Sequence, residues 1–190
     1  MKKIDFDCID ARLLKFNDDK KRFMKVYLKS FPKNEQIEYK EFYSGVFKDF
    51  QMYGFYLKNK LLGFVHFGEN KEFVHLNYLA VHKKHRGKGI GSYIISWLKN
   101  KFNNKPLVAD VENLDESAKN NTQRLKRLKF YYRNGFFDGI SEFEWEGSQM
   151  YYINTAKISD KAFMDHIQIC FPTIKDIRLH EDNYNKVITN

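Results

Sequence analysis

The sequence of 190 residues predicts an α/β fold, with a mixed, mostly antiparallel sheet flanked by helices. Three observations support this prediction. Apolar residues recur with the period of a strand in some segments and of a helix in others, and the two kinds of segment are interspersed. Short turns at 58–60 and 68–71 join three consecutive strand-like segments, as in antiparallel neighbours. The hydrophobic content of 43% suits one globular core.

The first half of the chain is expected to contribute four strands and two helices. Residues 8–14 alternate apolar and polar side chains, as a half-buried strand does. Residues 18–31 place apolar side chains at helical spacing and end before Pro32, which is typical of the end of a helix. The same helical spacing recurs over 38–50. The remaining strands are expected at 55–57, 61–67 and 72–81.

The second half is expected to contribute two helices and three strands. A helix follows a glycine-rich stretch and extends to about residue 102, and another spans 121–134 and is closed by Gly135. Their buried sides are expected to comprise Ile90, Ile94, Trp97 and Leu98 in the first helix and Leu125, Leu128 and Tyr132 in the second. The strands are expected at 106–111, 143–145 and 150–153.

The expected order of elements is strand, helix, helix, strand, strand, strand, helix, strand, helix, strand, strand. This order predicts a single domain over residues 1–158. Residues 159–190 are expected to form a short helix at 160–167 and an irregular tail, packed on the domain or extending from it.

The composition disfavours several classes of protein. The net charge of +9 comes from lysines scattered among acidic residues, which is typical of a solvated surface, so a nucleic-acid partner is not expected. No apolar run is long enough to span a membrane, and a cytoplasmic protein is expected. Cys8 and Cys170 form no CxxC motif and are expected to be buried free thiols. His82 and His85 lie in a basic loop without a carboxylate motif, so no metal site is predicted.

The glycine-rich stretch before the third helix is a candidate anion site. Its sequence is His85-Arg86-Gly87-Lys88-Gly89-Ile90-Gly91-Ser92. Glycines just before a helix let several backbone N–H groups point at one anion. The P-loop pattern fails because His82 and Gly89 occupy positions that require Gly and Ser or Thr. The dinucleotide pattern fails because its third glycine is Ser92.

A third pattern fits. The segment 86–91 matches (Gln/Arg)-x-x-Gly-x-Gly after a strand at 76–81, and residues 130–136, Phe-Tyr-Tyr-Arg-Asn-Gly-Phe, close a later helix. Together these motifs resemble the GNAT family of acyl-CoA-dependent N-acyltransferases. The resemblance covers residues 8 to about 153. It implies a GNAT-like domain, acetyl-CoA as cosubstrate, no metal, and transfer of an acetyl group to the primary amine of an acceptor.

The resemblance also implies which residues bind acetyl-CoA. The pyrophosphate would be held by the loop residues Arg86, Gly87, Lys88, Gly89, Ile90, Gly91 and Ser92. The pantetheine arm would lie along the fourth strand, on backbone groups of Leu79, Ala80 and Val81. His82 and His85, with neighbouring lysines, would add positive charge to the loop.

For catalysis, the resemblance implies that Tyr131 is the general acid that protonates the leaving thiolate. Tyr132 is expected to be a core residue. A general base is expected where the fourth strand separates from the fifth. Glu112, at the end of the fifth strand, is the first candidate, His75 on the fourth strand is the second, and Asp110 is the third.

Two other functions remain open at this stage: a CoA-binding sensor or scaffold without turnover, and a nucleic-acid-binding module. The phenol of Tyr131 favours the enzyme, because a binding protein has no need of it. The sequence leaves open the acceptor (polyamine, antibiotic, amino acid or peptide N-terminus), the length of the acyl group, and whether the protein is a monomer or a homodimer.

Overall fold

The computed structural model describes residues 4–145, 147–171 and 175–179 of the chain. These residues form two compact units. The first comprises Met1–Asn70 with Val74–Lys105, and the second comprises Lys71–Phe73 with Pro106–Asn190. Among the described residues, we find no helix with the length and apolar character needed to cross a membrane.

The first unit is built on four antiparallel strands in the order β1 (Asp10–Leu13), β2 (Gln51–Leu57), β3 (Lys60–Glu69) and β4 (Val74–Val81). The turn between β2 and β3 places Lys58 and Asn59 at φ 48° and 60°, the left-handed pair that suits a tight hairpin. On β3, Val65 pairs with Leu79 of β4, which fixes the register of the strand before the glycine-rich loop.

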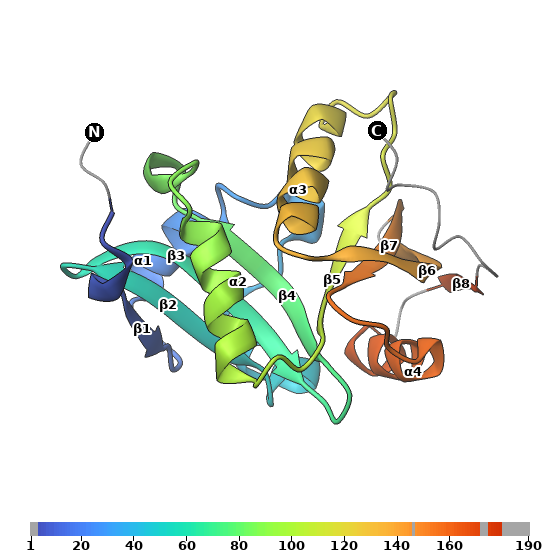
Figure 1. Ribbon diagram of the computed structural model, residues 1–190, viewed down its shortest axis with the longest axis horizontal. Coiled ribbons are helices and arrows are strands. Elements are labelled where there is room, and N and C mark those ends of the chain that lie inside the picture. Colours follow the sequence, from blue (N-terminus) through green and yellow to red (C-terminus); the bar gives the residue numbers. More distant parts are fainter. Residues whose placement is uncertain (1–3, 146, 172–174, 180–190) are drawn as a thin grey trace. The chain divides into compact units, whose positions relative to one another are not determined.

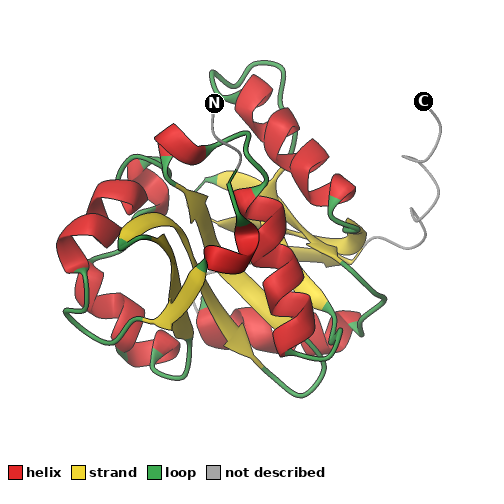
Figure 2. Ribbon diagram, turned by 60° about the vertical axis from the view of Figure 1, so that its left-hand side comes forward, coloured by secondary structure: helices red, strands yellow, loops and turns green. Residues whose placement is uncertain are grey.

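Helices cover both faces of this sheet (Figures 1 and 2). The helix α1 (Lys20–Tyr27) buries Phe23, Val26 and Tyr27 against one face, in a cluster with Phe64 of β3 and Tyr78 of β4. The opposite face packs against α2 (Ile90–Lys101), where the Trp97 ring lies 5.2 Å from that of Phe55. Successive side chains of a strand point to opposite faces of the sheet, so the same strands provide the apolar side chains that pack against the helices on both faces.

The second unit has four strands in antiparallel pairs and its own core. Its strands are β5 (Leu107–Glu112), β6 (Phe137–Trp145), β7 (Ser148–Asn154) and β8 (Lys175–Leu179), paired in the order β5-β7-β6-β8. The helices are α3 (Asn121–Arg133) and α4 (Asp160–Cys170). The α4 side chains Phe163 and Ile167 are fully buried with Tyr152 of β7. The predicted α/β class, with mostly antiparallel strands and flanking helices, is confirmed.

One predicted helix is wrong. Residues 38–50 form two short 3-10 helices, η3 (Tyr39–Tyr43) and η4 (Gly45–Phe47), rather than one α-helix. The backbone breaks where Ser44 is extended, with ψ 174°, and Gly45 is left-handed, with φ 57°. The apolar spacing was real, because Tyr39, Phe42 and Phe47 are buried, but it did not encode a continuous helix.

The two ends of the chain also differ from expectation. The helix predicted at 160–167 continues to Cys170, and the strand β8 replaces part of the predicted irregular tail, whose residues 180–190 lie outside the described residues. Cys170 is buried as predicted, whereas Cys8 is exposed in the 3-10 helix η1 (Phe6–Cys8) that precedes β1. Both thiols are free.

Candidate active site

The glycine-rich loop forms an open helix N-terminus. After the 3-10 helix η5 (Lys83–His85), Gly87 and Gly89 adopt φ values of 72° and 81°, a left-handed backbone that favours glycine. The first backbone bond of α2 runs from Tyr93 N–H to the Gly89 oxygen, over 2.9 Å. The N–H groups of Ile90 to Ser92 precede that bond, at the positive end of the helix. This arrangement suits a bound anion.

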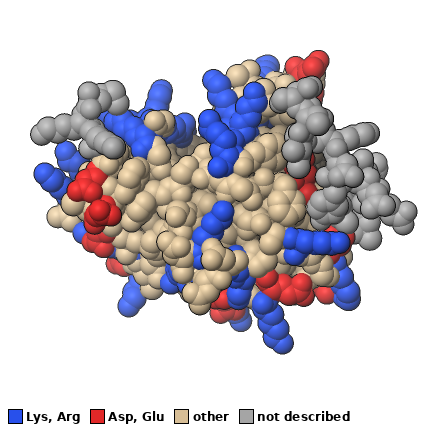
Figure 3. All heavy atoms as spheres, in the orientation of Figure 1, with Lys and Arg blue, Asp and Glu red and all other residues tan. Residues whose placement is uncertain are grey.

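Arg86 holds the loop to the rest of its unit. Its Nε donates to the Val81 carbonyl over 3.0 Å, and its Nη2 donates to Ser30 Oγ over 3.1 Å. Arg86 therefore donates two hydrogen bonds to other residues of its own unit, one at the end of β4 and one just beyond α1. Its charge stays at the loop, where Lys and Arg side chains gather on the surface (Figure 3).

The two histidines of the loop do not add the positive charge that the sequence suggested. Burial, followed by the neighbouring Lys25 and Lys84, lowers the pKa of His82 below 6.5. Burial and His82 lower the pKa of His85 in the same direction. His82 Nδ1 accepts a hydrogen bond from Lys84 N–H over 3.2 Å, which also requires an unprotonated nitrogen. The charge of the loop at pH 7 therefore comes from its Lys and Arg residues.

The loop also has an aromatic contact that was not predicted from the sequence. The Phe6 ring stacks on Tyr93 with ring centroids 5.3 Å apart and planes 19° from parallel. A Cβ added at Gly89 would lie 3.0 Å from Phe6 Cζ. The ring thus covers the side of Gly89 where a side chain would project. No motif or periodicity signals a contact between segments so far apart in sequence.

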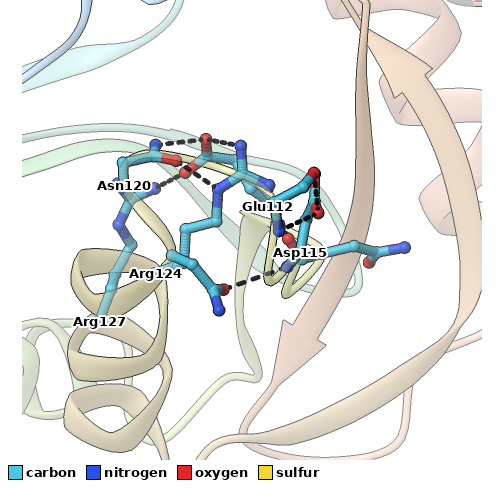
Figure 4. Close-up of polar contacts among 8 residues, drawn as sticks. Glu112, Asp115, Asn120, Arg124 and Arg127 are labelled. Carbon is cyan, nitrogen blue, oxygen red and sulfur yellow. Dashed lines mark hydrogen bonds and ion pairs between the residues drawn. The ribbon is translucent and has the colours of Figure 1, made fainter.

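In the second unit, Glu112 lies at the end of β5, with its carboxylate in a polar network (Figure 4). The residue is 6% exposed. Its Oε1 is 3.1 Å from Arg124 Nη2 and accepts from the Asn120 amide over 3.2 Å. Its Oε2 is 2.9 Å from Arg127 Nη1. Glu112 was predicted from the sequence as a base, but its two arginines were not predicted, because ion pairs between a strand and a following helix leave no local pattern in the sequence.

Tyr131 lies on α3, one turn beyond Arg127. It is 7% exposed, and its ring packs against Phe136 with centroids 5.0 Å apart. Burial raises the pKa of the phenol to about 12, while nearby Arg127 lowers it and Asp110 raises it. The phenol therefore keeps its proton at neutral pH.

The buried face of α3 differs from the one predicted. Leu128 is buried as expected, but Leu125 is 38% exposed. Tyr132 is only partly buried, and its hydroxyl donates to the Asp138 carboxylate. Tyr131 is the more buried of the two tyrosines. The prediction of Tyr132 as the core residue is therefore wrong, because α3 turns the Tyr131 side toward its sheet.

The other candidate bases have different surroundings. His75, on β4, is fully buried opposite Gly68, with its ring 6.3 Å from that of Phe50. Asp110 lies two residues before Glu112, on the same face of β5. The described residues thus place the loop, the backbone of 79–81 and His75 in the first unit, and Asp110, Glu112 and Tyr131 in the second.

The chain is similar to known acetyltransferases. Residues 48–137 match the Acetyltransferase (GNAT) domain. YjbC of Bacillus subtilis (strain 168), a protein named as an acetyltransferase, is 43% identical over 70 residues, which cover 37% of this chain and 34% of YjbC. The chain therefore spans about a third of the length of this relative.

Solved structures share the fold. A GNAT-family protein from Bacteroides thetaiotaomicron is 20% identical with a TM-score of 0.64, covering 84% of this chain and 93% of its own. A GNAT acetyltransferase from Elizabethkingia anophelis, with acetyl-CoA bound, is 17% identical with a TM-score of 0.57, covering 80% and 99%. The match over residues 48–137 includes both motifs of the sequence, the one at 86–91 and the one at 130–136. This part of the chain therefore matches a GNAT acetyltransferase domain, and the chain shares the fold of GNAT structures, as the two motifs predicted.

Proposed function

We propose that this protein is an N-acetyltransferase that transfers the acetyl group of acetyl-CoA to a primary amine. The observation that carries the proposal is the open start of α2, where two left-handed glycines precede three N–H groups at the positive end of a helix. An added Cβ at Gly87 would meet no other atom of the described part of the chain within 4 Å, so the loop backbone is accessible there. These features fit the pyrophosphate of CoA.

The chain's own residues take the following roles in this proposal. The loop residues 86–92 hold the pyrophosphate, and backbone groups of 79–81 hold the pantetheine arm. Acetyl-CoA supplies the activated acyl group, so a C–N bond forms as the C–S bond breaks. The Tyr131 phenol donates its proton to the departing sulfur. Because burial raises the pKa of this phenol to about 12, the proton is available throughout the neutral pH range.

The attacking amine must lose a proton to a base. Glu112 is engaged by the ion pairs with Arg124 and Arg127, and His75 and Asp110 are the other two candidates for this base. The carboxylate of Glu112 could accept a proton only by weakening both ion pairs, which disfavours it as the base.

Two measurements on the full chain test the proposal. Acetyl-CoA at about 100 times its dissociation constant should raise the free energy of unfolding by roughly 2.7 kcal/mol. A thiol assay should then detect CoA release when acetyl-CoA is mixed with one member of a panel of polyamines, aminoglycosides, amino acids and peptides. Stabilisation without CoA release from any amine would indicate a binding protein without turnover. Folded protein that millimolar acetyl-CoA does not stabilise would contradict the proposal.

A further inference from the structure

The carboxylate of Glu112 is the centre of a buried network at the start of α3 (Figure 4). Three donors engage it: Arg124 and Asn120 at Oε1, and Arg127 at Oε2, at 2.9 to 3.2 Å. The side chain of Glu112 is 5% exposed, and those of Arg124 and Arg127 are 14% and 26% exposed. The attraction between such buried charges offsets their loss of hydration only when the geometry is good and the polar atoms are hydrogen-bonded, so displacing any member of the network costs free energy.

Arg124 extends the network to the backbone on both sides of the connection between β5 and α3. Its Nε donates to Asn120 Oδ1 over 2.9 Å, and its Nη1 donates to the Asn113 carbonyl over 2.7 Å. Asn120 is the residue immediately before α3, and Asn113 is the residue immediately after β5. The planar guanidinium therefore ties the end of the strand to the start of the helix in a single geometry.

The same face of α3 carries Tyr131. Arg124, Arg127 and Tyr131 are spaced by three and four residues, which places them one above another on a helix. Glu112 and Asp110 share one face of β5. A rotation or a sliding movement of α3 that displaced Tyr131 would also pull Arg124 and Arg127 away from Glu112. The ion pairs at one end of the helix thus determine where the phenol lies at the other end.

The network also sets the charge near the phenol. Two guanidinium groups and one carboxylate leave one net positive charge on Glu112, Arg124 and Arg127. Arg127 lies one turn from Tyr131 and lowers the pKa of that phenol, against the larger effect of burial. The arginine that anchors the helix is therefore the one that makes the phenol a stronger acid.

We propose that Glu112 is a positioning residue for Tyr131: through Arg124 and Arg127 it holds α3 so that the phenol is placed to donate its proton. This inference rests on the proposed function and adds to it, because it removes Glu112 from the candidate bases and gives it a role that acts through the general acid. A displacement of about 1 Å at a reacting group can lower a rate by roughly 100-fold, so such a role matters for turnover.

A double-mutant cycle on kcat separates positioning from base catalysis. The variants are Glu112→Gln, Tyr131→Phe and the double variant, with saturating acetyl-CoA and the primary amine that releases CoA fastest in the panel. If Glu112 acts through Tyr131, the double variant should be about as slow as Tyr131→Phe alone. If Glu112 is the base, the two losses should multiply, and that result would overturn the inference.

A matched control and a second substitution protect this test. Asp165→Asn breaks an ion pair of 2.7 Å with Lys161 in the same unit, but on an exposed surface of α4, and it should leave kcat unchanged. Arg127→Lys keeps the positive charge and loses the planar fork. It should lower kcat by a smaller factor than Arg127→Met, and the loss should again disappear in the Tyr131→Phe background. The Arg127→Lys substitution provides the same test if Glu112→Gln does not fold.

A readout independent of turnover uses fluorine NMR. The protein is labelled with 3-fluorotyrosine, and the Tyr131 signal is assigned by its disappearance in Tyr131→Phe. Glu112→Gln and Arg127→Lys should shift or broaden this signal, and Asp165→Asn should not. A Tyr131 signal unchanged in both network variants would overturn the inference, even if the parent protein released no CoA with any amine. Failure of the proposed function and failure of this inference are therefore distinguishable.

Discussion

The helices α2 and α3 differ in what lies beside their first turns, although neither has a side-chain cap or an acidic residue in its first turn. At α2, the left-handed Gly89 precedes the helix in a glycine-rich loop. At α3, the Glu112 carboxylate of β5 binds the side chains of Asn120, Arg124 and Arg127. A glycine-rich helix start suits a ligand that brings negative charge to the backbone N–H groups, whereas ion pairs to a neighbouring strand hold a helix in position.

The largest effect on turnover is expected at α3, the helix that carries Tyr131. Tyr131→Phe keeps the ring and removes the hydroxyl, so kcat should fall by about 100-fold, while stability and affinity for acetyl-CoA change little. Steady-state rates at saturating acetyl-CoA measure this. Tyr132→Phe is the matched control, because it removes a hydroxyl bonded to Asp138 from the next residue, and it should retain most of the turnover. Equal rates for Tyr131→Phe and the parent would contradict the assignment of the general acid.

An intermediate effect, on the affinity for acetyl-CoA, is expected at the loop before α2. Arg86→Ala removes two hydrogen bonds that hold the loop and a charge beside it, so the dissociation constant for acetyl-CoA should rise by about tenfold or more. Isothermal titration calorimetry measures this change. Ser30→Ala removes only the partner of Nη2 and should have a smaller effect. Arg86→Ala protein that bound acetyl-CoA as tightly as the parent would show that the loop does not need this arginine.

The smallest effect concerns pH. Because burial and neighbouring positive charges lower the pKa values of His82 and His85 below 6.5, both rings are neutral at pH 7 and gain charge only as the pH falls. Their contribution to acetyl-CoA affinity should therefore increase as the pH falls below 6.5 and amount to roughly threefold at low salt. Titrations from pH 8 to 5.5 should show this increment in the parent and not in the double variant His82→Gln/His85→Gln. An increment of the same size in both proteins would exclude the two histidines as its source.

The sequence predicted the loop before α2 far better than the polar network of Glu112 at α3. The loop at 86–92 is contiguous, and the left-handed conformations of Gly87 and Gly89 give those two glycines a local backbone reason, so one short motif contains the whole candidate anion site. The network of Glu112 joins a strand to a helix through side chains of residues 112 to 127, and only the spacing of Arg124, Arg127 and Tyr131 on one face could have suggested it. Sequence alone gave no reason to pair those arginines with that carboxylate.

In the fold, too, elements with a strong local pattern were predicted, whereas elements that depend on backbone conformation or on a distant strand were not. The helices and strands with strong periodicity, such as α2 and β4, lie where they were predicted. The helix expected at 38–50 failed because apolar spacing reports which side chains are buried, and the conformations of Ser44 and Gly45 decide whether the backbone stays helical. The strand β8 was missed because it depends on pairing with β6.

The contact between Phe6 and Gly89 has an evolutionary consequence. The backbone at residue 89 favours glycine, and the Phe6 ring occupies the space that a larger side chain would need. A relative with a side chain at residue 89 should therefore have a smaller residue at the position of Phe6, or a different course of the chain before its first strand. The two positions are expected to change together over generations.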